Sequence, residues 1–423
     1  MSNETIYNKI KNFLLCSILL FIVIFSYIYS FEVRAEEIIN DNNEVIPNIG
    51  FWIKTSKMNN KYSGHLSVLL PNGNVLIRGD NTAEIFIPDK NMYKNIQVSD
   101  RQAASYANAN IMRDNNLLII YSSRMTGKSF DTLEVFDCEK ETFIKFNGKF
   151  PYPFSNTDSI LSANAYIISD KFILLSYHKK EQQKYYTEYY LYNYIDNTYS
   201  KIEYNDEYGR LDDCINRIDT KNQYFLSLNS QNQNIQNNSF YTYNILKLDT
   251  ENKKIKLIDE IKLNPGHKEV FVNGDIYFFY GKVLIDSREQ RENIQLSPIY
   301  KYNIKQKKLE KIGNLHNGGN VKTLLLNNGE ILFNSGIFSH KGFIDYIQYE
   351  IFDTKINTSF FTEKRPYYKK MNMTLLNDGS ILFTGGYIIR QDWEYGSSDS
   401  YRYYPNYKNL NRKYSSTQIK NKK

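Results

Sequence analysis

The stretch MNMTLLNDGSILFTGG (371–386) consists of a short apolar run, an Asp-Gly turn, a second apolar run and a group of small residues. Two other stretches repeat this order, HLSVLLPNGNVLIRGD (65–80) and VKTLLLNNGEILFNSG (321–336). Asn-Gly and Asp-Gly tolerate the positive φ angles of tight hairpins. Each stretch therefore predicts two antiparallel strands joined by a short turn.

Weaker copies of the same pattern lie between these three stretches. They lack a complete Asn-Gly or Asp-Gly turn in most cases, but each places a polar turn between two apolar runs. The turns recur at 43 to 55 residues, a regularity typical of repeat architectures. The seven turn positions are Gly73, Asn116, Asp170, Asn222, Gly274, Gly329 and Gly379.

A second hairpin follows most of the first ones, with an aromatic-rich strand, a polar turn and a further strand. Four strands in a repeat of roughly 50 residues predict one blade of a β-propeller. We therefore expect an all-β propeller of about seven four-stranded blades, with six or eight as the alternatives. The six clearest second hairpins are at 83–96, 133–146, 189–203, 243–258, 300–313 and 349–361.

The last repeat has no clear fourth strand after SYRYYPNYK (400–408), and an extra strand, FWIKTSKM (51–58), precedes the first hairpin. The simplest solution is that the N-terminal strand completes the C-terminal blade. Trp52 would then lie in the sheet that contains Tyr401 to Tyr404. Such a ring has no open sheet edge between its ends, which all-β proteins must otherwise protect.

These residues carry a family resemblance. The segment from Leu375 to Gly386 resembles the kelch signature found in kelch proteins and in the propeller domain of galactose oxidase, and Arg365-Pro366 and Trp52 with Gly64-His65 fit the same pattern. The resemblance covers residues 50–408 and implies a kelch-like propeller. The double glycine is missing from the second to fifth repeats.

Composition agrees with a large packed β domain. The chain has 423 residues, of which 41% are hydrophobic, and its 37 Tyr and 25 Phe favour pleated, half-buried surfaces. The formal charge is +7, and part of it lies in a basic tail at 409–423. No basic block interleaved with aromatic residues predicts a nucleic-acid groove.

The N-terminus predicts export. Lys9 and Lys11 precede an uncharged apolar run at 13–31, and Val33-Arg34-Ala35 provides small residues for cleavage after Ala35. The apolar run is also long enough to be an uncleaved membrane anchor. Both alternatives place the remainder outside the cytoplasmic membrane. We thus expect a signal peptide or anchor (1–35), a linker (36–49), the propeller (50–408) and the tail (409–423).

The resemblance to galactose oxidase implies copper held by two His and two Tyr, one Tyr being cross-linked to a Cys. The sequence does not favour this site: no two histidines have ligand spacing, and Cys138 lies in an outer turn. We expect no metal site and no cofactor. The five histidines are His65, His178, His267, His316 and His340.

Some kelch-like propellers act on sugars as epimerases or mutarotases, which need a positioned acid and base. Glu269, Asp392 and Glu394 are candidates on predicted loops, but none lies in a diagnostic motif. Catalytic residues therefore stay unknown, and a sugar-active enzyme, or less favourably a galactose-oxidase-like one, is the alternative function.

The favoured function is an exported binding module at the cell envelope or outside the cell, with a protein or carbohydrate partner. Loops between second and third strands and between blades open on one face of a propeller, where Arg and aromatic side chains are typical anchors. Trp393 is of special interest, because 388–396 is predicted to be a long loop. The predicted ligand-binding residues are His65, Arg78, Arg101, His178, His267, His340, Arg390 and Trp393.

Overall fold

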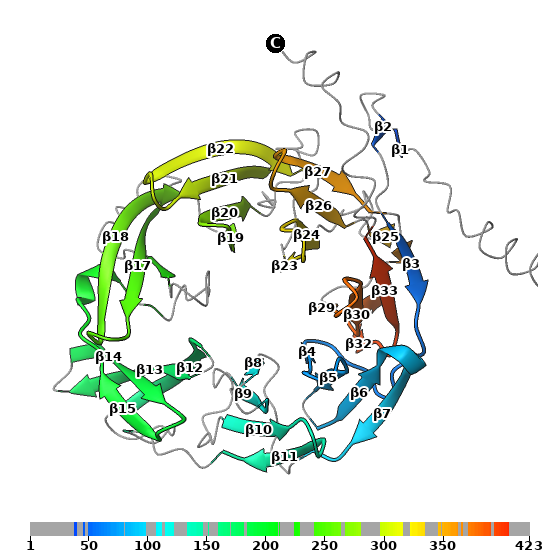
Figure 1. Ribbon diagram of the computed structural model, residues 1–423, viewed down its shortest axis with the longest axis horizontal. Helices are drawn as coiled ribbons and strands as arrows, with labels where there is room; N and C mark the ends of the chain where they lie inside the picture. The colour runs from blue at the N-terminus through cyan, green and yellow to red at the C-terminus, as the bar shows by residue number, and fades with distance from the viewer. Residues whose placement is uncertain are drawn as a thin grey trace, which may run out of the picture.

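The computed structural model shows antiparallel sheets arranged as blades around a central axis (Figure 1). It describes only the backbone of β1 (Ile38–Ile39) and β2 (Val45–Ile46), and the same holds for most of β31 and β32 and for a few other positions. The residues that it describes from position 50 onward are 50–79, 81–98, 107–111, 115–121, 133–146, 151, 160–169, 171–181, 184–209, 211, 224–228, 241–263, 267–280, 297–315, 322–334, 346–347, 349–362, 365–366, 371–390 and 393–405.

Seven sheets of three or four strands form the blades, which confirms the predicted all-β propeller. Blades are numbered along the chain, and strands are given from the axis outward. Blade 1 is β4 (Leu66–Leu69), β5 (Val75–Arg78), β6 (Ala83–Ile87) and β7 (Met92–Ile96); blade 2 is β8 (Ala107–Ile111), β9 (Leu117–Tyr121), β10 (Leu133–Asp137) and β11 (Thr142–Lys145); blade 3 is β12 (Ile160–Ile167), β13 (Phe172–Glu181), β14 (Lys184–Asn193) and β15 (Thr198–Lys201).

The other four blades follow the same order. Blade 4 is β16 (Tyr224–Leu228), β17 (Tyr241–Asp249) and β18 (Lys254–Leu263); blade 5 is β19 (His267–Val272), β20 (Asp275–Tyr280), β21 (Ser297–Asn303) and β22 (Lys308–Leu315); blade 6 is β23 (Lys322–Leu325), β24 (Ile331–Asn334), β26 (Glu350–Asp353) and β27 (Thr358–Phe361); blade 7 is β29 (Asn372–Leu375), β30 (Ile381–Thr384), β33 (Ser400–Tyr404) and β3 (Phe51–Lys54). The predicted first strand of blade 4, before Asn222, lies outside the described residues.

The remaining elements are short. Two single-turn 3-10 helices, η1 (Pro88–Lys90) and η2 (Asp206–Tyr208), and two small two-stranded sheets complete the described part. The sheets pair β25 (Tyr346–Ile347) with β28 (Arg365–Pro366), and β31 (Tyr387–Arg390) with β32 (Trp393–Gly396). The predicted signal or anchor, residues 1–35, lies outside it. Within the described residues, no helix is long and apolar enough to cross a membrane.

The core lies between the blades. Each of seven clusters of buried side chains draws its members from two adjacent blades. Leu76 and Ile85 of blade 1, for example, pack with Ile119 and Phe136 of blade 2, and all four are fully buried. Another cluster joins Ile77 of blade 1 to Leu382 of blade 7. The packing between blades is therefore continuous around the ring.

The N-terminal strand lies where the sequence predicted it. β3 pairs antiparallel with β33 and is the outer strand of blade 7, with Trp52 opposite Tyr403 (Figure 1). The indole ring of Trp52 contacts Tyr403 and Phe383 of blade 7 at 4.7 Å between centroids, and Tyr349 of blade 6 at 5.4 Å. Trp52 thus contacts two blades from the first strand of the ring.

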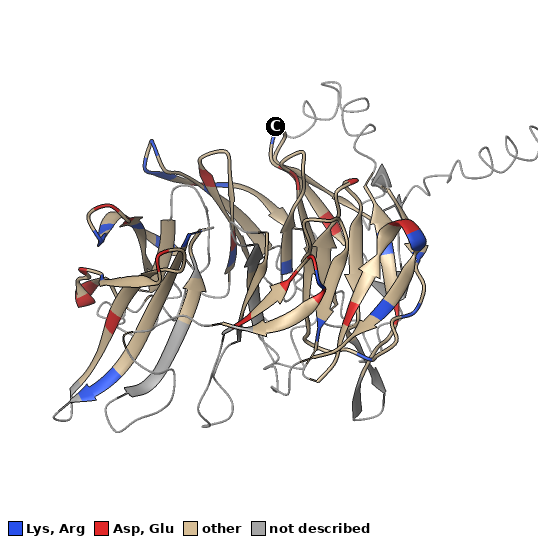
Figure 2. Ribbon diagram, turned by 60° about the horizontal axis from the view of Figure 1, so that its bottom comes forward, with Lys and Arg blue, Asp and Glu red and all other residues tan. Residues whose placement is uncertain are grey.

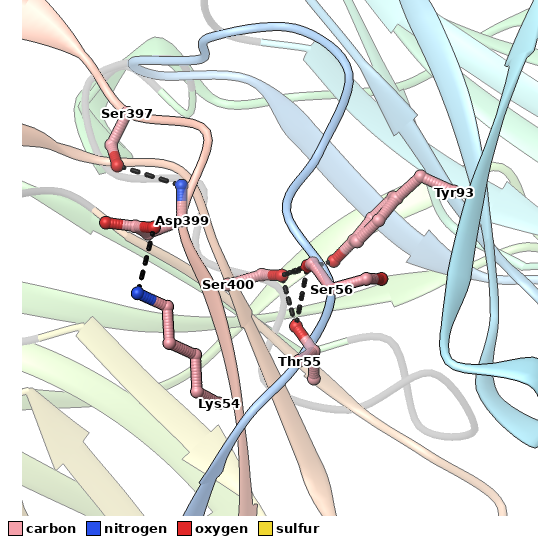
Figure 3. Close-up of polar contacts among 7 residues, drawn as sticks. All are labelled: Lys54, Thr55, Ser56, Tyr93, Ser397, Asp399 and Ser400. Atoms are coloured by element: carbon pink, nitrogen blue, oxygen red, sulfur yellow. Dashed lines mark hydrogen bonds and ion pairs between the residues drawn. The ribbon is translucent and has the colours of Figure 1, made fainter.

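Hydrogen bonds join blade 7, the chain leaving β3 and blade 1 (Figure 3). The Ser400 hydroxyl accepts a hydrogen bond from the Tyr93 hydroxyl at 2.7 Å and donates one to the carbonyl oxygen of Ser56 at 2.9 Å. The Thr55 hydroxyl contacts the same hydroxyl, and Thr55 donates its backbone N–H to the Ser400 carbonyl at 3.1 Å. Ser400 and Tyr93 are buried, so these bonds satisfy polar groups that have lost water.

Positive φ angles recur before the outermost strand of blades 1 to 6. The last turn residue has a φ between 47° and 55° in every case. Asn adopts this left-handed conformation readily, whereas Glu and Lys adopt it at higher cost. The six residues are Asn91, Glu141, Asn197, Lys253, Lys307 and Asn357.

We predict that Trp52→Ala lowers the free energy of unfolding by about 2–4 kcal/mol, because it removes a large side chain that packs against two blades. Ile53→Ala is the matched control, since Ile53 is 40% exposed on the opposite face of β3. Chemical denaturation of both variants measures the difference. Equal losses in the two variants would show that β3 contributes little to holding the ends of the ring together.

We also predict that Lys253→Gly raises the free energy of unfolding by about 0.5–1 kcal/mol, because Gly adopts a φ of 55° without steric cost. Lys253 is exposed, so the substitution removes no packing. Glu251 lies in the same turn but does not have a positive φ angle, so Glu251→Gly should lower stability. Thermal unfolding of both variants checks the sign.

Candidate functional site

The candidate site is the end of the ring at which the inner strands begin, here called the mouth. Because the strands of a blade are antiparallel, the second strand ends and the third begins at this same end. The mouth therefore brings together the first residues of β4, β19, β23 and β29. It also receives the connections between blades, as the sequence led us to expect.

A chain of hydrogen bonds links the mouth across three blades. Lys322, the first residue of β23, donates from Nζ to Oδ1 of Asn372 at 2.8 Å and to the carbonyl oxygen of Met371 at 3.4 Å. Asn372, the first residue of β29, donates from Nδ2 to the carbonyl oxygen of His65 just before β4. The beginnings of the inner strands of blades 6, 7 and 1 are thereby fixed relative to one another.

His65 is buried beneath this rim. Its Nε2 lies 2.8 Å from the Thr384 hydroxyl, and Nδ1 has no hydrogen-bond partner. Burial, together with the nearby charge of Lys322, lowers the pKa of His65 to about 3, so the ring is neutral at physiological pH. A Cβ at Gly385, which has a φ of +63°, would lie 2.6 Å from Cε1 of His65. The first glycine of the kelch-like pair therefore makes room for His65.

Arg78 is also inside the protein. Its side chain is fully buried, with Nε 4.0 Å from Oε2 of Glu134 in blade 2 and the guanidinium 5.3 Å from the centroid of the Phe143 ring. Arg78 thus connects blades 1 and 2 at the end of β5. Its predicted role in ligand binding stays a prediction, as does that of His65.

His178 and His267 lie in different surroundings. His178, on β13, is nearly buried, and its Nδ1 lies 2.8 Å from the Thr187 hydroxyl on β14. His267, at the start of β19, is half-buried, and its ring centroid lies 4.7 Å from that of Tyr243 in blade 4. The structure brings neither histidine together with His65, which lies in blade 1.

The remaining predicted residues are described incompletely or not at all. Arg101 and His340 lie outside the described residues. Arg390 and Trp393 are backbone partners in the β31–β32 hairpin. The segment 388–396 was expected to be a loop and is instead a short antiparallel hairpin over most of its length, so that expectation was wrong. The aromatic and β-branched residues Tyr387, Ile388 and Ile389 before Arg390 favour a strand here.

Glu269 lies in strand β19 and not in the loop that the sequence suggested. The residue is half-buried, and its Oε2 is hidden from solvent without a hydrogen-bond partner. Burial raises the pKa of Glu269 from 4.5 to about 7, although the charge of Lys268 opposes the shift. Because side chains alternate along a strand, Glu269 lies on the same face of β19 as His267. An acid that exchanges its proton near neutral pH is thus present close to the mouth.

Sequence reasoning missed the polar residues that fix the connections between blades. The Glu84 carboxylate on β6 accepts hydrogen bonds from the backbone N–H groups of Asn59 and Asn60 at 2.8 and 2.7 Å. Asn244 on β17 donates from Nδ2 to the carbonyl oxygen of Tyr208 at 2.7 Å. All three bonds hold the chain that arrives from the preceding blade. Glutamates at the start of the aromatic strands, in AEIF, LEVF and YEIF, were the available signal.

The sequence analysis also missed Lys322 and Asn372. Both occupy the second position of their repeats, in VKTLLL and MNMTLL, where blade 1 has Leu66. Aligning the three repeats by this column would have found them. Within the described residues, no group of three His, Cys, Asp or Glu side chains could hold a metal ion. Cys138 is buried in the turn after β10, at the opposite end of its blade from the mouth.

We predict that Glu269→Gln raises stability at pH 8 by about 1–3 kcal/mol and changes it little at pH 4. The pKa of Glu269 is higher in the folded chain than its ordinary value, so the wild type loses stability as the pH rises through 4.5 to about 7. The Gln variant lacks this loss. Denaturation at the two pH values checks it, with exposed Glu260→Gln as control. An equal effect at both pH values would contradict the assigned shift.

No family model matches the chain, and no curated protein matches it. Solved structures do resemble it. One of them is a novel fungal alcohol oxidase with catalytic diversity among the AA5 family, in complex with copper. The two chains have 14% identical residues and a TM-score of 0.56, and the match covers 85% of this chain and 77% of the oxidase. At this identity the likeness concerns the fold alone, a seven-bladed β-propeller.

Proposed function

We propose that the chain is a binding module that recognises its ligand at the mouth of the propeller. The observation that carries this proposal is the fixed polar rim, in which Lys322, Asn372 and the backbone of His65 are hydrogen-bonded across three blades. Lys268 adds an exposed cation on the neighbouring inner strand β19. Polar groups held in place before binding lose little entropy when a ligand arrives, so such a rim favours recognition.

We further propose that the propeller acts outside the cytoplasmic membrane. The support is the basic and apolar N-terminus followed by Val33-Arg34-Ala35. Mass spectrometry of the exported protein should find Glu36 as the first residue. An intact Met1 on the exported protein would instead show that the apolar segment is retained as an anchor.

The second candidate is an exported enzyme acting on sugars. Glu269 favours it, because this carboxyl has a pKa of about 7 and lies on the same strand face as His267. Copper chemistry like that of the AA5 oxidase receives no such support. The described residues contain no group of three His, Cys, Asp or Glu for a metal ion, and the described histidines lie in three different blades. We therefore derive no step through copper.

A screen of the full-length protein in detergent against glycans and small metabolites tests the proposal. We predict a ligand that binds without being converted, and Lys322→Ala should weaken its binding about fivefold to tenfold. Lys308→Ala is the matched control, since Lys308 lies at the start of β22, at the opposite end of its blade from the mouth.

The outcomes separate the two candidate functions. Binding that depends on Lys322 without turnover supports the binding module. Turnover that is lost in Glu269→Gln would contradict it and support the sugar-active enzyme. Equal affinity of the Lys322→Ala and Lys308→Ala variants for a bound ligand would remove the rim of blades 6, 7 and 1 as its site.

A further inference from the structure

Blade 3 carries an unusually long hairpin at the mouth. β13 and β14 have 10 residues each, whereas β5 and β6 of blade 1 have 4 and 5. β12 pairs with β13 only as far as Lys179, and β15 pairs with β14 only from Tyr190 inward. The tip of the hairpin therefore extends as two strands. Figure 2 shows it at the lower left, with Lys or Arg positions near its end.

One face of this tip presents an aromatic ring and a cation. Lys180 and Tyr185 are directly opposite each other across the two strands. Nζ of Lys180 lies 5.5 Å from the centroid of the Tyr185 ring. Tyr185 is 70% exposed, the largest exposed fraction among the large hydrophobic residues that the structure describes. Tyrosine combines an apolar ring with a polar hydroxyl and is enriched at interfaces, so its exposure at the end of a projecting hairpin suits a contact surface.

On the same face as Lys180 and Tyr185, the next residue pair toward the body of the blade is His178 and Thr187. Their hydrogen bond of 2.8 Å between Nδ1 and the hydroxyl supports the exposed pair from below. His178 was predicted from the sequence as a binding residue. Its position therefore makes it a support for the exposed pair and not the outermost contact.

The opposite face of the hairpin is held by ion pairs. Glu188 binds Nζ of Lys179 and Nζ of Lys201, each at 2.5 Å. The Lys179 side chain is nearly buried, so this contact is protected from solvent screening. The cluster fixes the twist of the two strands. The cluster contains two cations for one carboxylate.

We propose that the tip of the β13–β14 hairpin binds an anionic sugar, with the apolar face of the sugar ring against Tyr185 and its acidic group against Lys180. The inference rests on the proposed function, because it names the ligand class of the mouth. Aromatic side chains offer a flat apolar surface at low entropic cost, and lysine supplies the charge that selects an acid.

The experiment measures binding to the full-length protein in detergent by calorimetry. The probes are a hexuronate oligosaccharide, a sialylated trisaccharide and a sulfated hexasaccharide, with maltohexaose as the neutral comparison. We expect at least one acidic probe to bind more tightly than maltohexaose. Tyr185→Ala and Lys180→Ala should each weaken that binding at least about fivefold, and Tyr185→Phe should retain it. Binding should also weaken when the salt concentration rises.

Two substitutions in the same blade are matched controls. Tyr199→Ala removes a tyrosine that is 48% exposed on β15, and Lys171→Ala removes a lysine 5.4 Å from the centroid of the Phe172 ring at the other end of β13. Both should bind the acidic probe as the wild type does. Circular dichroism of every variant confirms that the blade is folded.

The outcomes also separate this inference from the proposed function. A glycan or metabolite whose binding depends on Lys322 but not on Tyr185 overturns the hairpin site and leaves the binding module intact. Binding of maltohexaose as tight as that of the acidic probes overturns the preference for an anion. Failure of all acidic probes, while the general screen finds another ligand, likewise overturns this inference alone. Failure of every ligand overturns both.

Discussion

A sheet of four short strands has two apolar faces and can bury both only between two neighbouring sheets. No blade of such a protein can therefore lie at an end, because an end would expose a face of large aromatic and aliphatic side chains to water. The ring satisfies this requirement with seven interfaces for seven blades, including one between the last blade and the first. All other features depend on that packing.

The N-terminal strand meets the same requirement at the covalent ends of the ring. β3 belongs to blade 7 although it precedes blade 1 in sequence, so the chain passes from the last sheet into the first without a break. Thr55, Ser56 and Ser400 are hydrogen-bonded at this passage, together with Tyr93 from blade 1. Separating blades 7 and 1 would thus expose apolar surface and leave buried polar groups unpaired.

The blades share their packing but differ at the mouth. Figure 2 shows acidic and basic residues interspersed over the described chain. What distinguishes the mouth is local: the hydrogen-bonded rim of blades 6, 7 and 1, the half-buried Glu269 in blade 5 and the long hairpin of blade 3. Residues at these positions can differ while the apolar clusters between the blades stay the same.

The fold could be read from the sequence because its determinants are local. Asn-Gly and Asp-Gly mark the turns by their backbone preferences, and Gly73, Gly329 and Gly379 indeed have φ angles between 83° and 86°. The site could not be read in the same way. Arg78 and His65 lie at the expected end of the ring, but each faces a neighbouring blade, and a single strand does not show which of its faces that neighbour covers. Glu269 was assigned to a loop because its charge interrupts the apolar pattern of HKEVFV, although this segment is strand β19.

Hydrogen–deuterium exchange of the peptide 51–55 tests the central claim most directly. The account predicts that the amides of 51–55 that pair with β33 are as strongly protected as those of β5 in blade 1. These amides should also exchange together with those of residues 400–404. Rapid exchange of 51–55 beside a protected β33 would show that the first strand does not complete the last blade.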